Sequence, residues 1–431
     1  MFNIRSKEFK HYFANTFWMM AERILRMIVT LFVTVYVARY LGPERFGILC
    51  YATSFVGIFS AVALLGLEEI VIRNLVRDSR NQNKVLGTAF ILKAMGAMLA
   101  FVLILIALQF SSGNMLSKTI VLIIAAGMIF QTFNVIGFYF QSQVLAKLNA
   151  AALLAALIAS SVAKLWLVVI QAPLIWFAVA IILENVVVAL SLLLIYIRHD
   201  LNFFNWRFNY QTARELFKES WSVMLSGLLV MVYLRIDQIM IKEILGNEAV
   251  GQYAVAARIT GVTYFISIAL TMSLFPAVIN AKRLDQATYN YRTQQFYDLM
   301  VWLSIVIALP IALFSNEITV LLFGDKYAEA GAVLSVHIWA SVFFFLMVAS
   351  EKWFLAEDLT TLLFYRALMG AILNIVLNLI LIPKYKIFGA AISSVITQFA
   401  VGYLYDAFNK NTLVSFRLKT KSFFPVHLIK G

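Results

Sequence analysis

The sequence predicts an all-α integral membrane protein, with about twelve transmembrane helices in two parallel six-helix lobes around a central cationic cavity. Three observations support this fold class. The chain is 62% hydrophobic and only 13% charged, with a mean hydropathy of +0.86, whereas soluble domains are about 25% charged. Apolar windows of about 20 residues, the length that crosses the hydrocarbon core, recur along the whole chain. A short motif also occurs twice, once in each half.

Twelve apolar segments are long enough to cross a membrane. The fifth and sixth are separated by Gln171-Ala172-Pro173. The first is too long for the apolar part of a cleavable signal peptide and carries charges, so we expect it to remain as a helix. In chain order the segments are 12–38, 46–68, 85–110, 117–140, 151–172, 173–197, 217–242, 251–280, 296–318, 331–350, 361–382 and 387–408.

The repeated motif is L-G-x-E-x-x-G, which spans Leu41–Gly47 and again Leu245–Gly251. The second residue of each copy, Gly42 or Gly246, suits the left-handed end of a helix. The following Glu suits the start of the next helix. Six segments per half is an even number, so the halves are expected to be parallel repeats. A common tight hairpin found twice by chance is the alternative.

These repeats predict a division of the chain into four parts. Residues 1–197 form an N-terminal six-helix lobe, 198–216 a cytoplasmic linker, 217–408 a C-terminal six-helix lobe, and 409–431 a basic cytoplasmic tail. The hydrophilic loops are all short, so we expect any function to reside within the helices.

The loops also predict an orientation. If both termini lie in the cytoplasm, cytoplasmic segments hold 21 Lys and Arg residues and the opposite loops hold seven. This bias follows the preference of positive residues for the cytoplasmic side. The net charge of +13 is therefore interpreted as a signal for topology and for contact with anionic membrane lipids. Nucleic acid is not an expected partner, because the basic residues are spread over separate short loops.

Charged residues inside the apolar segments are the main indication of function. An ionisable group at bilayer depth costs roughly 2.5–3.5 kcal/mol, so such groups face a bundle interior or a wet cavity. Cations outnumber carboxylates there, which indicates a cavity that receives an anion. The cations are Arg23, Arg26, Lys93, Lys164, Arg235, Arg258 and Arg366, and the carboxylates are Glu22, Glu184 and Asp237.

Two of these cations share one face of the first segment. Arg23 and Arg26 are three residues apart, and Glu22 precedes Arg26 by four, the favourable order for an ion pair. Arg26 is therefore either a substrate contact or simply compensated by Glu22. Lys164 and Glu184 lie near the middle of consecutive segments, and we favour a structural pair between them. The alternative makes Glu184 a proton- or sodium-responsive carboxylate.

The second half offers a similar set. Arg235, Asp237 and Arg258 lie at comparable depth, and a guanidinium binds phosphate oxygens in a bidentate manner. The alternative is a structural Arg–Asp bridge between neighbouring helices. Asp237 is the second candidate for an ion-coupling carboxylate. Arg366 is expected to extend along its helix to the cytoplasmic surface.

Polar residues within the segments have two open interpretations: they line a sugar path or they join helices. They include Gln131, Asn134, Gln141, Asn374, Asn378 and Gln398.

Several longer stretches resemble the polysaccharide transporter family of O-antigen flippases. The resemblance extends from about residue 15 to 405. The stretches that carry it are ARYLGPERFGIL at 38–49, LGTAFILK at 86–93, RIDQIM at 235–240, and the polar-apolar run at 374–383 followed by Gly389-Ala390-Ala391.

The resemblance implies a flippase that moves undecaprenyl-diphosphate-linked oligosaccharide from the cytoplasmic to the periplasmic leaflet of the bacterial inner membrane. In relatives, arginines on the first and eighth helices line the cavity, and Arg23, Arg26 and Arg258 match those helices here. A glycan polymerase and a chain-length regulator are implied as protein partners.

Other functions fit the sequence less well. A lipid II flippase is the nearest alternative. A multidrug-type exporter of cations should carry acidic residues in its lumen, whereas cations outnumber carboxylates in the apolar segments of this chain. A membrane enzyme is not expected, because there is no large exterior loop and no carboxylate–histidine cluster. A scaffold role would not explain cations at bilayer depth. Neither a metal site nor a cofactor is indicated, and Cys50 has no cysteine to pair with.

Overall fold

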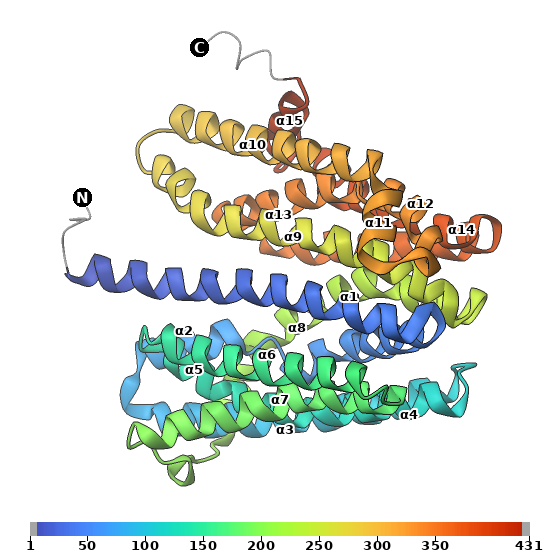
Figure 1. Cartoon of the computed structure of the whole chain (residues 1–431). Coiled ribbons are helices and arrows are strands. Elements are labelled where there is room, and N and C mark those ends of the chain that lie inside the picture. Colours follow the sequence, from blue (N-terminus) through green and yellow to red (C-terminus); the bar gives the residue numbers. More distant parts are fainter. Residues whose placement is uncertain (1–6, 425–431) are drawn as a thin grey trace. The chain divides into compact units, whose positions relative to one another are not determined.

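The computed structural model describes residues 7–424, and every regular element within that range is a helix (Figure 1). Backbone amides have no water to bond in a hydrocarbon environment, so helices, which bond internally, are the natural solution for this apolar chain. The chain divides into two compact units. Unit 1 holds the described residues up to Leu41 together with Ile48–Met231, and unit 2 holds Gly42–Gly47 together with the described residues from Val232 onward.

Unit 1 is built from helices of the first half of the chain. Figure 1 shows α6 and α7 side by side, and the two pack along their lengths. Its core lies between α2, α3, α5, α6 and α7. The helices are most of α1 (Lys7–Leu64), α2 (Glu68–Arg77), α3 (Gln82–Gln109), α4 (Met115–Ala126), η2 (Gly127–Phe133), α5 (Asn134–Ser142), α6 (Ala146–Val169), α7 (Leu174–Arg198) and the first part of α8 (Tyr210–Leu245), with the short turns η1 (Ser79–Asn81) and η3 (Phe203–Asn205).

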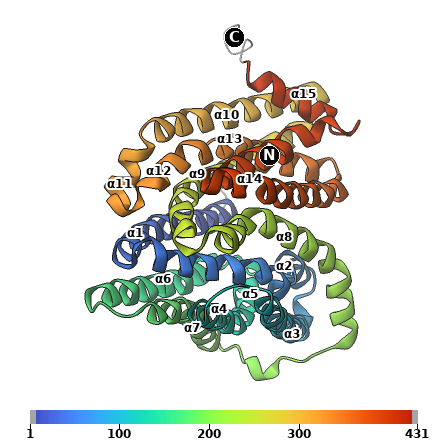
Figure 2. The same cartoon turned by 90° about the vertical axis from the view of Figure 1, so that its right-hand side faces the viewer.

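Unit 2 is arranged around α13, which packs against α9, α10 and α14 (Figure 2). Nearly every residue of α13 up to Ser350 is apolar or small and buried, as expected for a helix surrounded by others. The helices are the rest of α8, α9 (Asn247–Lys282), α10 (Gln286–Leu313), α11 (Ser315–Phe323), α12 (Ala328–His337), α13 (Ala340–Ala356), α14 (Thr360–Gly402) and α15 (Leu413–Ser422), with the short turns η4 (Asp325–Tyr327) and η5 (Leu404–Ala407).

The helices account for the predicted apolar segments. Within residues 7–424, nine helices are long and apolar enough to cross a membrane, or ten if the bent pair Asp325–His337 and Ala340–Ala356 forms one span. Two long helices each hold two predicted segments. The backbone of α1 leaves helical geometry at Gly42, and that of α14 leaves it at Lys386. Each of the twelve predicted segments therefore corresponds to a mainly helical stretch, although some, such as 46–68, 296–318 and 387–408, run past the ends of α1, α10 and α14.

The two copies of the repeated motif adopt the predicted backbone. Gly42 and Gly246 have φ of 71° and 94°, in the left-handed region that glycine tolerates. The last glycines of the two motifs then pack reciprocally. A Cβ on Gly47 would lie 1.8 Å from the carbonyl oxygen of Asn247, and a Cβ on Gly251 would lie 2.0 Å from that of Pro43. Each motif therefore requires a glycine where it crosses the other, which makes a chance hairpin a poor explanation.

Gly251→Ala should destabilise the protein, because its methyl group would displace the Pro43 carbonyl from a backbone contact. Overpacking of this kind costs about 1–3 kcal/mol. Gly261 lies on the same helix with nothing within 4 Å of its Cβ position, so Gly261→Ala is the matched control. Chemical unfolding of the purified variants in detergent measures the difference in their free energy of unfolding. Equal stability of the two variants would contradict the close backbone contact between Gly251 and the Pro43 carbonyl.

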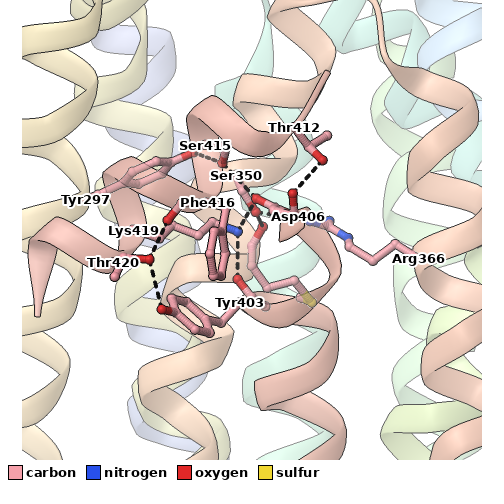
Figure 3. Close-up of polar contacts among 12 residues, drawn as sticks. Tyr297, Ser350, Arg366, Tyr403, Asp406, Thr412, Ser415, Phe416, Lys419 and Thr420 are labelled. Atoms are coloured by element: carbon pink, nitrogen blue, oxygen red, sulfur yellow. Dashed lines mark hydrogen bonds and ion pairs between the residues drawn. The ribbon is translucent and has the colours of Figure 1, made fainter. Parts of the chain in front are cut away.

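The C-terminal part of unit 2 differs from the expected basic tail. Residues 413–422 form α15, which packs against α10 and α13, while residues 425–431 lie outside the described range. Lys419 is fully buried, and its Nζ lies 2.7 Å from Asp406 Oδ2. Figure 3 shows the two side chains in contact. Part of the predicted tail is therefore an integral element of the unit.

Arg366 does not extend to the surface, although the sequence predicted that it would. Its side chain is buried, with only 5% exposed, rather than extended to the surface. Its Nη1 donates to Ser350 Oγ at 3.0 Å, and its guanidinium lies 5.2 Å from the Phe354 ring centroid. The hydroxyl and the aromatic face on α13 compensate the buried guanidinium, which removes the need to reach water.

Candidate functional site

A charged cluster in unit 1 joins α1, α6 and α7. Arg26 Nε donates to Glu22 Oε1 at 2.7 Å, its Nη1 donates to Glu184 Oε1 at 3.0 Å, and its Nη2 donates to the Leu153 carbonyl at 3.2 Å. The predicted pair between Glu22 and Arg26 is thus confirmed. Because Arg26 also contacts Glu184, this one guanidinium connects two carboxylates from different helices.

The second carboxylate oxygen of Glu184 completes the cluster. Lys164 Nζ lies 3.6 Å from Glu184 Oε2, and Ser160 Oγ donates to the same oxygen at 3.2 Å. The predicted Lys164–Glu184 pair is therefore confirmed. The side chains of Arg26, Lys164 and Glu184 are 22–30% exposed, so the cluster lies at the surface of unit 1 rather than sealed in its core.

In unit 2, Asp237 forms the centre of a buried polar site. Tyr253 Oη and Ser394 Oγ donate to its Oδ2 at 2.6 and 2.5 Å, and Asn378 Nδ2 donates to its Oδ1 at 2.6 Å. Among the described residues, these hydrogen-bond partners are all neutral, so they do not form the alternative Arg–Asp bridge. Three donors aimed at one carboxylate match its ionised form, which only accepts hydrogen bonds.

A small cavity of about 70 Å³ adjoins this carboxylate. Gln238, His337, Thr397 and Gln398 are among its lining residues. Thr397 Oγ1 and Gln398 Oε1 are buried and have no hydrogen-bond partner among the described residues. Unpaired buried oxygens are costly unless something binds them. The cavity is too small for a sugar, yet it offers oxygen ligands of the type that hard cations prefer.

This site does not match a transition-metal centre. In the part of the chain that the structure describes, no group of three or more His, Cys, Asp and Glu could hold a metal ion. The single carboxylate with neutral oxygens is instead suited to a proton or a monovalent cation.

The remaining predicted cations are distributed over both units. Arg23 and Lys93 lie in unit 1, and Arg235 and Arg258 lie in unit 2. Arg23 and Arg258 are exposed and Arg235 is half-buried. Lys93 is 1% exposed, and its Nζ lies 4.8 Å from the Phe138 ring centroid. A role for Lys93 in binding substrate would require this apolar enclosure to open, and it stays a prediction.

The partners of Asp237 were not predicted from the sequence. Tyr253 lies 16 residues away, while Asn378 and Ser394 lie 141 and 157 residues away. One signal was present: Asn374 and Asn378 are four residues apart, which places two amides on one face of an apolar helix. In the structure Asn378 Nδ2 also donates to Asn374 Oδ1 at 3.0 Å, and both residues are fully buried.

Long apolar helices, a duplicated motif and charges inside apolar segments indicate a multi-pass membrane protein. Two protein families match the sequence of this chain. It matches the polysaccharide biosynthesis protein family over residues 12–281 and the MatE family over residues 223–380. The first match covers more than half of the chain, so the chain belongs to the polysaccharide biosynthesis protein family.

Two curated archaeal relatives share part of the sequence. The probable low-salt glycan biosynthesis flippase Agl15 of Haloferax volcanii is 26% identical over 218 residues, which is 49% of this chain and 45% of that protein. The uncharacterized membrane protein MJ1068 of Methanocaldococcus jannaschii is 25% identical over 234 residues, 52% of this chain and 44% of that protein. Each alignment covers less than half of the relative's length.

Solved structures share the fold over nearly the whole chain. The lipid II flippase MurJ in an inward closed conformation aligns with a TM-score of 0.74 at 14% identity, covering 95% of this chain and 91% of that one. An inward-facing multidrug resistance MATE family transporter of the MOP superfamily aligns with a TM-score of 0.69 at 15% identity, covering 94% and 95%. These similarities show that the chain has the two-lobe, twelve-helix fold of these proteins.

Proposed function

We propose that this protein is a flippase that moves undecaprenyl-diphosphate-linked oligosaccharide, such as an O-antigen repeat unit, from the cytoplasmic to the periplasmic leaflet of the bacterial inner membrane by alternating access. The observation that carries the proposal is the excess of cations over carboxylates inside apolar segments. Membership of the polysaccharide biosynthesis protein family and the similarity to a glycan biosynthesis flippase support it.

The diphosphate is the part of this substrate that the cations would bind. Guanidinium groups present paired donors to phosphate oxygens, whereas a lysine ammonium acts as a compact point charge. We assign Arg23, Arg26 and Arg258 as the principal contacts, since all three side chains are exposed or half-exposed. Arg235, Lys164 and Lys93 are secondary contacts. The glycan crosses in a wet path, and the polyprenyl tail stays in lipid.

Asp237 is the better of the two candidates for ion coupling. Its carboxylate is buried among neutral donors beside a cavity with unpaired oxygens. Glu184, by contrast, already holds two cations. A proton or monovalent cation bound at Asp237 would cancel the buried charge, so ion binding and release would favour different packings of α8, α9 and α14.

Two other cargoes remain as alternatives on the same fold. A lipid II flippase would use the same diphosphate chemistry with a different glycan, and the structural similarity to MurJ suits it. A multidrug-type exporter of cationic compounds fits less well, because cations outnumber carboxylates in the apolar segments.

Export in a flippase-deleted cell tests the proposal. Wild type should restore surface glycan. At matched expression, export should fall by roughly tenfold in each of the variants Arg23→Ala, Arg26→Ala and Arg258→Ala, because a hydrogen bond to a charged group contributes about 1.5–3 kcal/mol. Lipid-linked repeat units should then accumulate in the cytoplasmic leaflet.

Arg198→Ala is the control, since Arg198 is exposed in the last turn of α7, at the end of an apolar segment. Full export by the three single variants and by the triple variant would contradict the assignment of these arginines.

A further inference from the structure

Glu184 places its two carboxylate oxygens on two different cations. Oε1 accepts from Arg26 Nη1 of α1 at 3.0 Å, and Oε2 lies 3.6 Å from Lys164 Nζ of α6. One carboxylate on α7 thus spans the two cations in the way that two anionic oxygens of a ligand would.

We infer that Glu184 is a built-in competitor for the anionic group of the substrate, so that a diphosphate binds Arg26 and Lys164 by displacing the Glu184 carboxylate. This inference rests on the proposed function, and it adds a residue that determines which anions bind.

The cluster is built so that Glu184 is the group that can leave. Glu22 is 7% exposed at its side chain and holds Arg26 Nε, and the Leu153 carbonyl holds Nη2. These two contacts fix the guanidinium while Nη1 points to Glu184. The Lys164–Glu184 distance of 3.6 Å exceeds that of a good hydrogen bond. Glu184 is also 27% exposed, so its release needs no unfolding.

The cluster of Arg26, Lys164, Glu22 and Glu184 is electrically balanced. Arg26 and Lys164 together with Glu22 and Glu184 sum to zero, so without substrate the cluster holds no net charge at membrane depth, where unpaired charge is expensive. A ligand has to supply at least two closely spaced negative oxygens to replace the carboxylate on both cations. A diphosphate does so better than a monophosphate, and an uncharged lipid cannot compete.

A purely structural role for the same contacts predicts a different result. If Glu184 only ties three helices together, its removal lowers stability and leaves affinity for anions unchanged or weaker. If Glu184 competes with the ligand, its removal strengthens binding of the anion. The two roles therefore differ in the sign of the change in affinity.

The test measures the dissociation constant of farnesyl diphosphate for the purified full-length protein in detergent by calorimetry. Glu184→Gln should bind it roughly tenfold more tightly than wild type, since the ligand no longer has to break charged hydrogen bonds. Farnesyl monophosphate should gain less, and farnesol should not respond. Glu215→Gln, which removes one exposed negative charge elsewhere in unit 1, should leave the dissociation constant unchanged.

Two further variants test whether the gain in affinity comes from the removal of the Glu184 carboxylate from Arg26. Glu184→Asp retains the charge but is too short to span both cations, so it should give a smaller gain, and it serves if Glu184→Gln does not fold. Adding Arg26→Ala to Glu184→Gln should abolish the gain. Unchanged or weaker diphosphate binding by both Glu184 variants, with measurable binding by wild type, would overturn the inference and leave the proposed function intact. No diphosphate binding by any of the proteins would count against both.

Discussion

Lys419→Met is expected to lower the free energy of unfolding by about 3–5 kcal/mol at neutral pH, because it leaves the Asp406 carboxylate buried without its cation. Both side chains are 0% exposed, and Lys419 Nζ contacts Asp406 Oδ2 and the Gly402 carbonyl, each at 2.7 Å (Figure 3). Burial lowers the pKa of Lys419 to about 8, so the lysine is still mostly protonated at neutral pH. Denaturant unfolding of the purified protein in detergent measures the loss.

Two variants show whether the loss comes from the unpaired charge. Lys421 lies two residues further on α15 and is exposed, so Lys421→Met should be nearly neutral. Adding Asp406→Asn to Lys419→Met should recover part of the stability, since the remaining buried group is then uncharged. A Lys419→Met protein as stable as Lys421→Met would mean that α15 is not an integral part of unit 2.

Asp237→Asn is expected to abolish ion-driven accumulation of cargo while the protein still folds. A monovalent cation moving down a potential of 100 mV supplies about 2.3 kcal/mol, which corresponds to about 50-fold in the distribution of cargo across the membrane. An asparagine keeps the size of the side chain but cannot carry the charge that a bound cation neutralises. Accumulation in membrane vesicles, measured with and without an imposed ion gradient, reports the loss.

Asp358→Asn provides the comparison. Asp358 lies in the turn between α13 and α14 with φ of 58°, a conformation that asparagine also tolerates. This variant should respond to the gradient as wild type does. If Asp237→Asn retained the full response to both proton and sodium gradients, Asp237 would have a structural role only.

The class of fold and two ion pairs were predictable because they depend on local patterns. Apolar length defines a membrane helix whatever its neighbours, and the positive φ of Gly42 and Gly246 follows from the end of each helix. Lys164 and Glu184 lie on consecutive helices, which pack along their lengths. The structure confirmed the pair they form, and that of Glu22 with Arg26, which are four residues apart.

The features that escaped prediction depend on contacts between distant segments. Residues 409–431 carry five Lys and Arg, and their composition alone predicted a basic cytoplasmic tail. Lys419 is buried only because Asp406 and the Gly402 carbonyl lie opposite it. Arg366 likewise depends on Ser350 of another helix. The neutral partners of Asp237 come from α9 and α14, and no local pattern connects those segments.

The central claim, that membrane-embedded cations move a diphosphate-linked glycan, is tested most directly by translocation in vesicles. The purified protein would be reconstituted with a fluorescent oligosaccharide carried on a polyprenyl diphosphate or, in parallel, on the matching monophosphate. The fraction exposed to a membrane-impermeant quencher would then be followed with time. We expect rapid transfer of the diphosphate-linked glycan, slow transfer of the monophosphate form, and loss of the difference in Arg26→Ala. Equal transfer of both lipids, or none above protein-free vesicles, would contradict the claim.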